Sequence, residues 1–372
     1  MRVVICGGGV IGAASAYFLS RRGIDVVVVE RTGVACAASG RAGGFLALDW
    51  CAASPLDALA RRSFALHARL PGEIEGDWGF RRMEAYAGYI MSMRAPRRGG
   101  AVAERGWLTD EVVIASKIGT RDTTAIVQPA ALTSALMRAA QAFGAEVRLE
   151  QVTGVVHDQS GSTVRGVEVV GGTIAADAVI FTLGPWSILA AQWLRLPPVF
   201  GQLSPSLVFD TGTAIPAEAL FLEQQDQTGE VLTVEVFPRA DGTTFVAAFS
   251  STVPIPTDPA HVKPEPGTIE RLLAICERVS PHFTESNIVA RQACFRPITR
   301  DFLPIIGRVP NAEGAYVATG HNVWGILNSL ATGEAVAELV ADGAAKTIDL
   351  LPFDPARLRP SDPRHSAQAA RH

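Results

Sequence analysis

The chain has 372 residues, 48% of them hydrophobic and 19% charged, which is typical of a globular protein large enough for two domains. Its formal net charge of −4 argues against nucleic acid as a partner, because no excess of basic residues is available to neutralise phosphates. No apolar run reaches the length of a membrane span and no secretory signal precedes the first strand, so we expect neither a transmembrane segment nor export.

The first thirty residues predict a strand–helix–strand unit. Residues 2–6 (RVVIC) are a short apolar run, as in a buried strand, and residues 25–29 (DVVVV) are a second one. The helix expected between them, 10–22, carries small residues where it must lie close to a sheet. This order is typical of a β-α-β unit and predicts the α/β fold class with a Rossmann-type domain.

The loop between the first strand and the helix reads GGGVIG and fits G-x-G-x-x-G. In this pattern Gly7 permits a tight turn, Gly9 lets the backbone approach a pyrophosphate, and Gly12 allows close packing of helix and strand. The helix N-terminus presents free N–H groups to phosphates. Glu30 ends the second strand, where it can accept hydrogen bonds from ribose hydroxyls. Together these features predict an adenine dinucleotide, with a glycine-rich structural turn as the alternative.

The next segments predict a second ligand loop and the start of a second domain. Residues 36–45 form another glycine-rich loop, which indicates backbone approach to a ligand, although a plain turn is the alternative. A helix is expected at 55–70 from its apolar spacing. Residues 77–122 are irregular and contain a short strand at 87–93 and a basic turn at 94–99.

The middle of the chain alternates between the two predicted domains. A helix at 130–143 precedes a strand at 146–151, and a small β-meander follows over 152–176. The buried strand 177–182 runs into the glycine turn 183–187, which is typical of a segment that packs against a dinucleotide.

The last third of the chain predicts a sheet followed by a return to the cofactor. Residues 196–288 alternate apolar and polar side chains, as in an antiparallel sheet, with a helix at 268–279. A strand at 315–318, a glycine loop at 320–326 and a helix at 331–340 would then direct a positive helix end at a ligand.

Cysteine usage and the tail add two expectations. The five cysteines are odd in number and lack paired spacing, which indicates reduced thiols and a cytoplasmic location, and no C-x-x-C or histidine cluster predicts a metal site. The tail from residue 354 onward has no core pattern, and we expect its end to be disordered.

Five motifs cover nearly the whole chain: GGGVIG with Glu30, ASGRAGG, TLGPWS, RPITRDFLPIIG and GHNVWGI. In order and spacing they resemble the glycine oxidase / D-amino-acid oxidase (DAO) family of FAD-dependent oxidoreductases, and ASGRAGGFLA and GHNVWGI resemble a branch whose substrate is poorly defined. The resemblance implies FAD, a small-molecule amine or amino-acid substrate, and hydride transfer to flavin N5. Dioxygen, giving hydrogen peroxide, or another acceptor would reoxidise the flavin.

The resemblance also implies two interleaved domains. A Rossmann-type FAD-binding domain would take residues 1–76, 124–190 and 290–350. An α+β substrate domain, built on a large antiparallel sheet over the flavin, would take 77–123 and 191–289. Residues 354–372 would be a partly disordered tail.

The cofactor contacts of the family fall on the glycine loops, the strand ends and the last loop. The residues implied are Gly7, Gly9, Val10, Ile11, Gly12, Glu30, Arg31, Ser39, Gly43, Gly44, Phe45, Val152, Gly184, Trp186, His321, Asn322, Val323, Trp324, Gly325, Ile326 and Leu327.

Three residues are implied in catalysis. Arg296 stands where glycine-oxidase-like members hold the substrate carboxylate, and the alternative is a structural ion pair with Asp301 or Glu235. His321 matches a histidine near the flavin, with a buried core histidine as the alternative. Trp324 replaces a cation found in sarcosine-oxidase-like members.

Other departures bear on the substrate and on the oxidant. Val323 replaces an arginine of glycine-oxidase-like members, so the pocket is expected to be more apolar and to suit a bulkier or less anionic substrate. The lysine that helps dioxygen react in sarcosine-oxidase-like members aligns near Val246, which leaves oxidase and dehydrogenase both open. Cys294 has the spacing of a cysteine bonded to flavin in those members, but we expect a free thiol and non-covalent FAD.

Two further functions stay open at the level of sequence: a flavin dehydrogenase for a 2-hydroxy acid, and a non-catalytic FAD-binding interaction protein. A nicotinamide-only dehydrogenase is disfavoured, because it would not need the GHNVWGI return to the cofactor. The substrate, the electron acceptor and the formation of a homo-oligomer also stay open.

Overall fold

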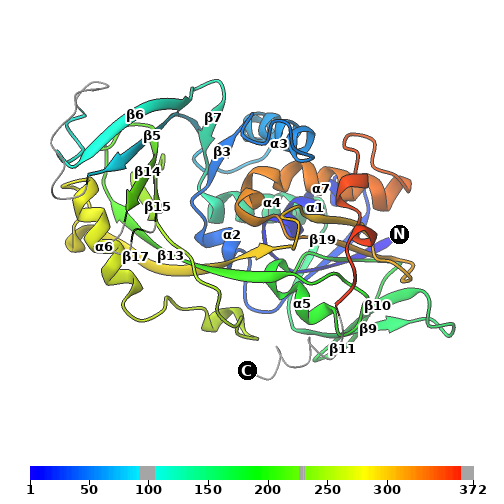
Figure 1. Ribbon diagram of the computed structural model, residues 1–372. Coiled ribbons are helices and arrows are strands. Elements are labelled where there is room, and N and C mark those ends of the chain that lie inside the picture. The colour runs from blue at the N-terminus through cyan, green and yellow to red at the C-terminus, as the bar shows by residue number, and fades with distance from the viewer. Residues whose placement is uncertain (92–104, 226–228, 230, 362–372) are drawn as a thin grey trace.

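The computed structural model describes residues 1–91, 105–225, 229 and 231–361, and two large sheets organise them. Figure 1 shows the sheets next to each other, with helices α1, α4 and α7 against one and α6 against the other. The helices are α1 (Val10–Ser20), α2 (Ala38–Arg41), α3 (Asp57–Arg69), α4 (Pro129–Ala142), α5 (Ser187–Ala190), α6 (Thr268–Val279) and α7 (Gly325–Asp342). Among the described helices, none combines the length and the apolar character that a membrane crossing needs.

The first sheet has the predicted Rossmann-type arrangement. Its order is β18 (Ile305–Arg308), β19 (Ala315–Thr319), β12 (Ala178–Phe181), β1 (Arg2–Cys6), β2 (Asp25–Glu30) and β8 (Glu146–Leu149). All neighbours from β19 to β8 are parallel, and β18 pairs antiparallel to β19. Helices bury one face of β1 and β2 and a small sheet buries the other, so both strands are apolar along their length.

The small residues of α1 serve helix packing as well as the sheet. A side chain added at Gly333 of α7 would lie 2.6 Å from the Cβ of Ala14, so the two helices approach closely. Every residue of α1 is buried, between the first sheet, α4 and α7. From the sequence alone, the small residues of α1 are explained by packing on the sheet. They are also needed because α7 packs closely against α1.

Helix α7 begins at Gly325, whereas the sequence predicts a start at residue 331. Side chains of α3 stabilise the additional turns through hydrogen bonds to the α7 backbone. Ser63 Oγ accepts a hydrogen bond from the Ala331 N–H at 3.1 Å, and His67 Nε2 donates to the carbonyls of Ile326 and Leu327 at 3.0 and 3.1 Å. Burial lowers the pKa of His67 to about 4, so its ring is neutral at pH 7. These contacts position the N-terminus of α7.

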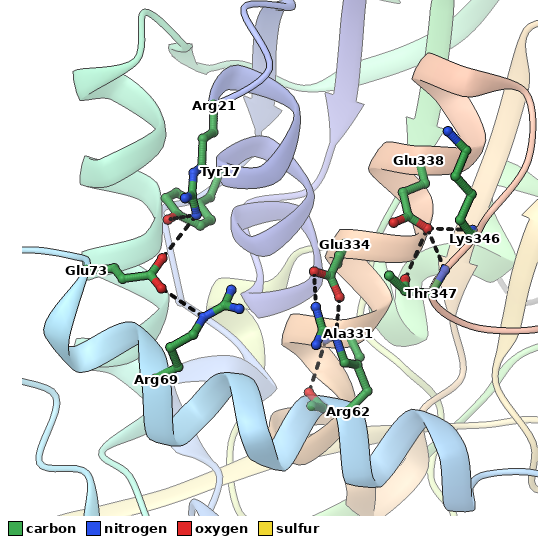
Figure 2. Close-up of polar contacts among 11 residues, drawn as sticks. Tyr17, Arg21, Arg62, Arg69, Glu73, Ala331, Glu334, Glu338, Lys346 and Thr347 are labelled. Atoms are coloured by element: carbon green, nitrogen blue, oxygen red, sulfur yellow. Dashed lines mark hydrogen bonds and ion pairs between the residues drawn. The ribbon is translucent and has the colours of Figure 1, made fainter.

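Ion pairs on the outer side of this layer join α3 to α7 and α1, as Figure 2 shows. Arg62 of α3 holds Glu334 of α7 through two hydrogen bonds of 2.6 and 2.7 Å. Glu73 contacts both Arg69, at 2.8 Å, and Arg21 of α1, at 3.1 Å. The bidentate Arg62–Glu334 pair resists rotation of α3 on α7 better than a single contact would.

The second sheet is mostly antiparallel, as the alternating pattern predicts. Its order is β17 (Ile288–Ile298), β13 (Phe200–Asp210), β16 (Thr243–Ala247), β15 (Val231–Pro238), β14 (Glu218–Gln225), β5 (Glu84–Ile90) and β6 (Val112–Gly119). Only the β14–β5 pair is parallel. Helix α6 packs on its outer face through residues such as Leu272, against Leu207 and Val246.

Two small sheets complete the fold. One contains β9 (Val152–His157), β10 (Val164–Val169) and β11 (Gly172–Ala175), and the other contains β3 (Phe45–Ala47), β7 (Thr124–Ile126) and β4 (Arg81–Arg82). The predicted basic turn 94–99 and the end of the predicted tail, 362–372, lie outside the described residues. The start of the tail is held in place, because Arg357 pairs with Asp301 at 2.8 Å.

Candidate active site

A cavity of about 390 Å³ lies between the glycine loops of the first sheet and the inner face of the second sheet. It brings together segments from the whole chain, including the loop after β1, α2, the β12 end, β15, β17 and the α7 start. The predicted residues Arg296, His321 and Trp324 all line it. All the predicted cofactor residues line it as well, except Gly12 and Leu327, which lie behind the lining.

The first glycine loop has the backbone geometry that only glycine allows. Gly7 has φ +110°, and its N–H donates to the Val29 carbonyl at 2.8 Å. A Cβ at Gly12 would lie 2.0 Å from the Gly7 carbonyl oxygen. At Gly9 the closest described atom to an added Cβ is Ser39 Oγ, at 3.1 Å. Gly7 and Gly12 thus shape the loop, and Gly9 faces the cavity.

Two helices begin at the cavity without a side-chain cap on their N-cap residue. Helix α1 starts after Gly9, and its Val10 N–H donates to Ser39 Oγ at 2.9 Å. Helix α7 starts after Trp324, and both Gly325 and Ile326 line the cavity. Both positive helix ends therefore face the cavity and favour an anionic group of a ligand, although Ser39 already accepts from the first N–H of α1.

Glu30 is held in one orientation at the end of β2. One carboxylate oxygen accepts from the Gly8 N–H at 2.7 Å, and the other accepts from the Thr32 N–H at 2.8 Å. The side chain is nearly buried and lines the cavity. The oxygen bonded to Thr32 also accepts from the Gly33 N–H at 3.3 Å, whereas the oxygen bonded to Gly8 has no other donor among the described residues and can accept from a ribose hydroxyl. The adjacent Arg31 pairs with Asp258 at 3.3 Å.

The second glycine loop packs on the second sheet. A Cβ at Gly43 would lie 2.5 Å from the Phe237 ring, and a Cβ at Gly44, which has φ +92°, would lie 2.0 Å from the Val127 carbonyl oxygen. Arg239 donates to the carbonyls of Ala42, at 2.8 Å, and Gly43, at 3.4 Å. Burial lowers the pKa of Arg239 to about 10. These contacts join the loop to the sheet above the cavity.

Strand register decides which side chains of the second sheet reach the cavity. Phe221 lies opposite Glu235, Phe237 lies opposite Phe245, and Ser204 lies opposite Cys294. Opposite residues share a face of the sheet, and alternate residues along a strand return to it. Accordingly, the residues on this face that line the cavity are Ser204, Ser206, Phe221, Glu235, Phe237, Phe245, Cys294 and Arg296.

Arg296 and Glu235 are the charged pair of this face. Their closest side-chain atoms, Arg296 Nη2 and Glu235 Oε2, are 3.9 Å apart, which is too long for a hydrogen bond. Among the described residues, neither side chain has another hydrogen-bond partner. Burial raises the pKa of Glu235, and Arg296 opposes that rise. Of the two predicted ion-pair partners of Arg296, Glu235 is therefore present, whereas Asp301 pairs with Arg357.

His321 is both buried and part of the cavity wall, so the two interpretations of this residue are compatible. Its Nε2 atom is hydrogen-bonded to Thr332 Oγ1 at 3.1 Å. Burial lowers its pKa to about 3, and the ring is neutral at pH 7. A neutral imidazole can donate or accept one proton in a hydrogen bond but brings no charge to a ligand.

An aromatic cluster closes the cavity beside the charged pair. We use this name for Phe45, Trp50, Phe221, Phe237 and Trp324. Phe45 lies at the centre, with ring centroids 5.1 to 5.3 Å from three of the others, and Trp50 meets Trp324 edge-on at 6.4 Å. All five line the cavity, so an apolar group can be enclosed here.

The sequence predictions missed several of these residues. Trp50, Phe221 and Phe237 were not named, and Glu235 appeared only as an alternative partner of Arg296. The alternation of Glu235 and Phe237 in β15 was the available signal, because residues two apart share a face. No such signal exists for Trp50, which reaches the cavity from the turn after β3.

The position aligned with the dioxygen-activating lysine does not face the cavity. Val246 is fully buried between the second sheet and α6. Its neighbours in β16, Phe245 and Ala247, point the other way, toward Phe237 and the cavity side. The described residues that line the cavity include no lysine.

The cavity fits an adenine dinucleotide at three places. Gly184 leaves room at the wall, since an added Cβ there, with φ +54°, would meet no described atom within 4 Å. The N-terminus of α1, where the N-cap residue Gly9 has no side chain, faces the cavity and suits a pyrophosphate. The fixed carboxylate of Glu30 suits a ribose diol. These features agree with the predicted cofactor, FAD.

Comparisons with known proteins identify the family. Residues 2–339 match the family described as DAO, FAD dependent oxidoreductase. Glycine oxidase of Geobacillus kaustophilus is 28% identical over 94% of this chain and 95% of its own. The crystal structure of glycine oxidase from that organism has a TM-score of 0.79 at 25% identity, covering 96% of this chain and 99% of that one. An oxidoreductase of Schizosaccharomyces pombe is 26% identical over 95% of this chain and 97% of its own. The chain belongs to the DAO family of FAD-dependent oxidoreductases.

Proposed function

We propose that this protein oxidises the C–N bond of an amino acid or of a primary or secondary amine. The observation that carries the proposal is the unsatisfied Arg296–Glu235 pair, which faces the cavity beside the aromatic cluster. FAD, when bound, supplies the acceptor for a hydride from the carbon that bears nitrogen. Arg296 would bind the substrate carboxylate through its planar fork and so orient that carbon.

The surrounding residues favour this reaction by excluding water. The aromatic cluster and the buried, neutral His321 present few charges, so the Arg296 guanidinium acts in a weakly screened environment. The relatives named glycine oxidase, one of them 28% identical to this chain, support an amine or amino-acid substrate. Five free cysteines support the proposed cytoplasmic location.

The proposal is tested by an anaerobic substrate screen with the purified flavoprotein. Bleaching of the flavin absorbance by at least one amine or amino acid supports it, and peroxide formation on readmission of air would identify an oxidase. Bleaching only by lactate-like 2-hydroxy acids favours the dehydrogenase alternative. A flavoprotein that no member of either panel reduces would contradict the proposal and favour a binding role.

Glu30→Ala is expected to weaken FAD binding by about 10- to 100-fold. The variant loses hydrogen bonds to a buried ribose, each of about 1–3 kcal/mol, and leaves the Gly8 N–H without its acceptor. Flavin fluorescence titration of the apoprotein measures the dissociation constant. Asp25→Ala, on the exposed start of the same strand, is the matched control and should bind FAD normally. Equal affinity of Glu30→Ala and wild type would remove this residue from the ribose site.

We expect the flavin to be released by acid precipitation, because Cys294 is a poor nucleophile here. Burial raises the pKa of its thiol, while Arg296 and Arg41 only partly oppose the rise. The supernatant should therefore turn yellow and the pellet should be colourless. Non-covalent binding would be contradicted if the yellow colour of the wild-type protein stayed in the pellet and the pellet of Cys294→Ser were colourless.

A further inference from the structure

We propose that the preferred substrate is a zwitterionic α-amino acid with an aromatic or other large apolar side chain. In this arrangement Glu235 binds the substrate ammonium group, and the aromatic cluster encloses the side chain. The inference rests on the proposed function, which it narrows from amines in general to one class of amino acid. It makes Glu235, Trp50 and Phe221 specificity-determining residues.

The first step of the argument is the geometry of the charged pair. A cation and an anion that face one cavity at 3.9 Å, without a hydrogen bond between them, keep their donors and acceptors available. The carboxylate and ammonium of an α-amino acid hang on one carbon and are separated by a similarly short distance. One such molecule can therefore satisfy both side chains, its carboxylate on Arg296 and its ammonium on Glu235.

The second step is the charge balance of the site. The Arg296–Glu235 pair is neutral overall, so a 2-hydroxy acid would add an unbalanced negative charge beside Glu235, and a simple amine would add an unbalanced positive charge beside Arg296. An unpaired charge in a buried site is costly, so both partial matches are disfavoured. His321 cannot supply a balancing cation, because its pKa is lowered to about 3.

The third step is the position of the aromatic cluster relative to this pair. Phe221 lies directly opposite Glu235 in the β14–β15 ladder, and Phe237 follows Glu235 by two residues on the same face. Phe221 in turn contacts Trp50 at 5.0 Å and Phe237 at 5.4 Å. The wall next to the ammonium site is therefore made of aromatic rings. An aromatic side chain gains from edge-to-face contacts there, whereas glycine would leave that surface uncovered.

Three compounds that lack an α-hydrogen test binding without turnover in the FAD-loaded protein. α-Methylphenylalanine carries all three recognition features, 2-aminoisobutyrate lacks the ring, and 2-hydroxy-2-methyl-3-phenylpropanoate lacks the ammonium. Calorimetric titration, or perturbation of the flavin spectrum, gives each dissociation constant. We expect α-methylphenylalanine to bind at least tenfold more tightly than either of the other two. Equal or weaker binding would overturn the inference.

Two variants assign the preference to named residues. Glu235→Gln should weaken binding of α-methylphenylalanine by tenfold or more, because the ammonium group loses its carboxylate. The same variant should bind the hydroxy acid at least as tightly as wild type, because the carboxylate that disfavours a second anion is gone. Trp50→Ala should weaken the binding of α-methylphenylalanine, whose ring contacts the aromatic cluster, and should leave the dissociation constant of 2-aminoisobutyrate unchanged. Flavin content and unfolding midpoint confirm that each variant is folded, and Trp50→Phe is a milder substitute. If either variant lost affinity equally for α-methylphenylalanine and for its comparison compound, the preference could not be assigned to the substituted residue.

The outcome can be separated from that of the proposed function. If the amine panel reduces the flavin while these compounds bind without preference, only the substrate class proposed here is wrong. If no amine or amino acid reduces the flavin, the proposed function fails whatever the binding constants are.

Discussion

Replacing Arg296 with alanine is expected to lower kcat/KM for an amino-acid substrate by at least about 100-fold. A bidentate carboxylate loses two hydrogen bonds to a charged group, each of about 1.5–3 kcal/mol. Arg296→Lys should also be impaired, by about tenfold, because an ammonium cannot reproduce the planar fork. Steady-state kinetics with the best substrate of the anaerobic screen gives these ratios.

Removal of Arg296 also leaves Glu235 without its cation, so a second variant is needed for the interpretation. Arg296→Ala combined with Glu235→Gln removes both charges, and the comparison with the single variants separates carboxylate binding from an unpaired Glu235. An amine substrate without a carboxylate should be much less affected by Arg296→Ala. Unchanged kcat and KM in the single variant would exclude Arg296 from the site.

Gly12→Ala is expected to abolish isolation of the protein with bound FAD. The new Cβ would lie 2.0 Å from the Gly7 carbonyl oxygen and 2.8 Å from Thr182 Oγ1, so the loop and helix α1 would have to separate. Such overpacking costs about 1–3 kcal/mol in the free energy of unfolding and moves the backbone donors away from the pyrophosphate. Flavin content after purification and chemical denaturation of the apoprotein measure both effects.

The matched control for this variant is Gly72→Ala. An added Cβ at Gly72 would meet no described atom within 4 Å, and the residue is exposed. We expect full flavin content and an unchanged unfolding midpoint for Gly72→Ala. A Gly12→Ala protein that carries stoichiometric FAD would contradict the role assigned to this glycine.

The sequence by itself was sufficient for the Rossmann-type unit and its cofactor, because the information is local. Strands β1 and β2 are buried on both faces and therefore read as continuous apolar runs. Gly7 and Gly12 are required by the backbone of a single loop. Helix α6 was predicted with its observed bounds, since one face packs on the sheet and the other is exposed.

Helix α7 was harder to delimit, because its first turns depend on another segment. Gly325, Asn328 and Ser329 are weak helix formers, and the backbone of these turns is completed by Ser63 and His67 of α3. Those partners are distant in sequence, so no local pattern could indicate where the helix begins.

Only the tertiary structure decided how the substrate end of the cavity is built. Glu235 and Arg296 lie on strands that are not neighbours in the sheet, and they meet because long side chains converge over its inner face. Trp50 joins Phe221 from a turn of a different sheet. Backbone-bound cofactors leave a local signature of glycines, whereas a substrate pocket is assembled from single side chains of separate strands, whose meeting depends on register and sheet order.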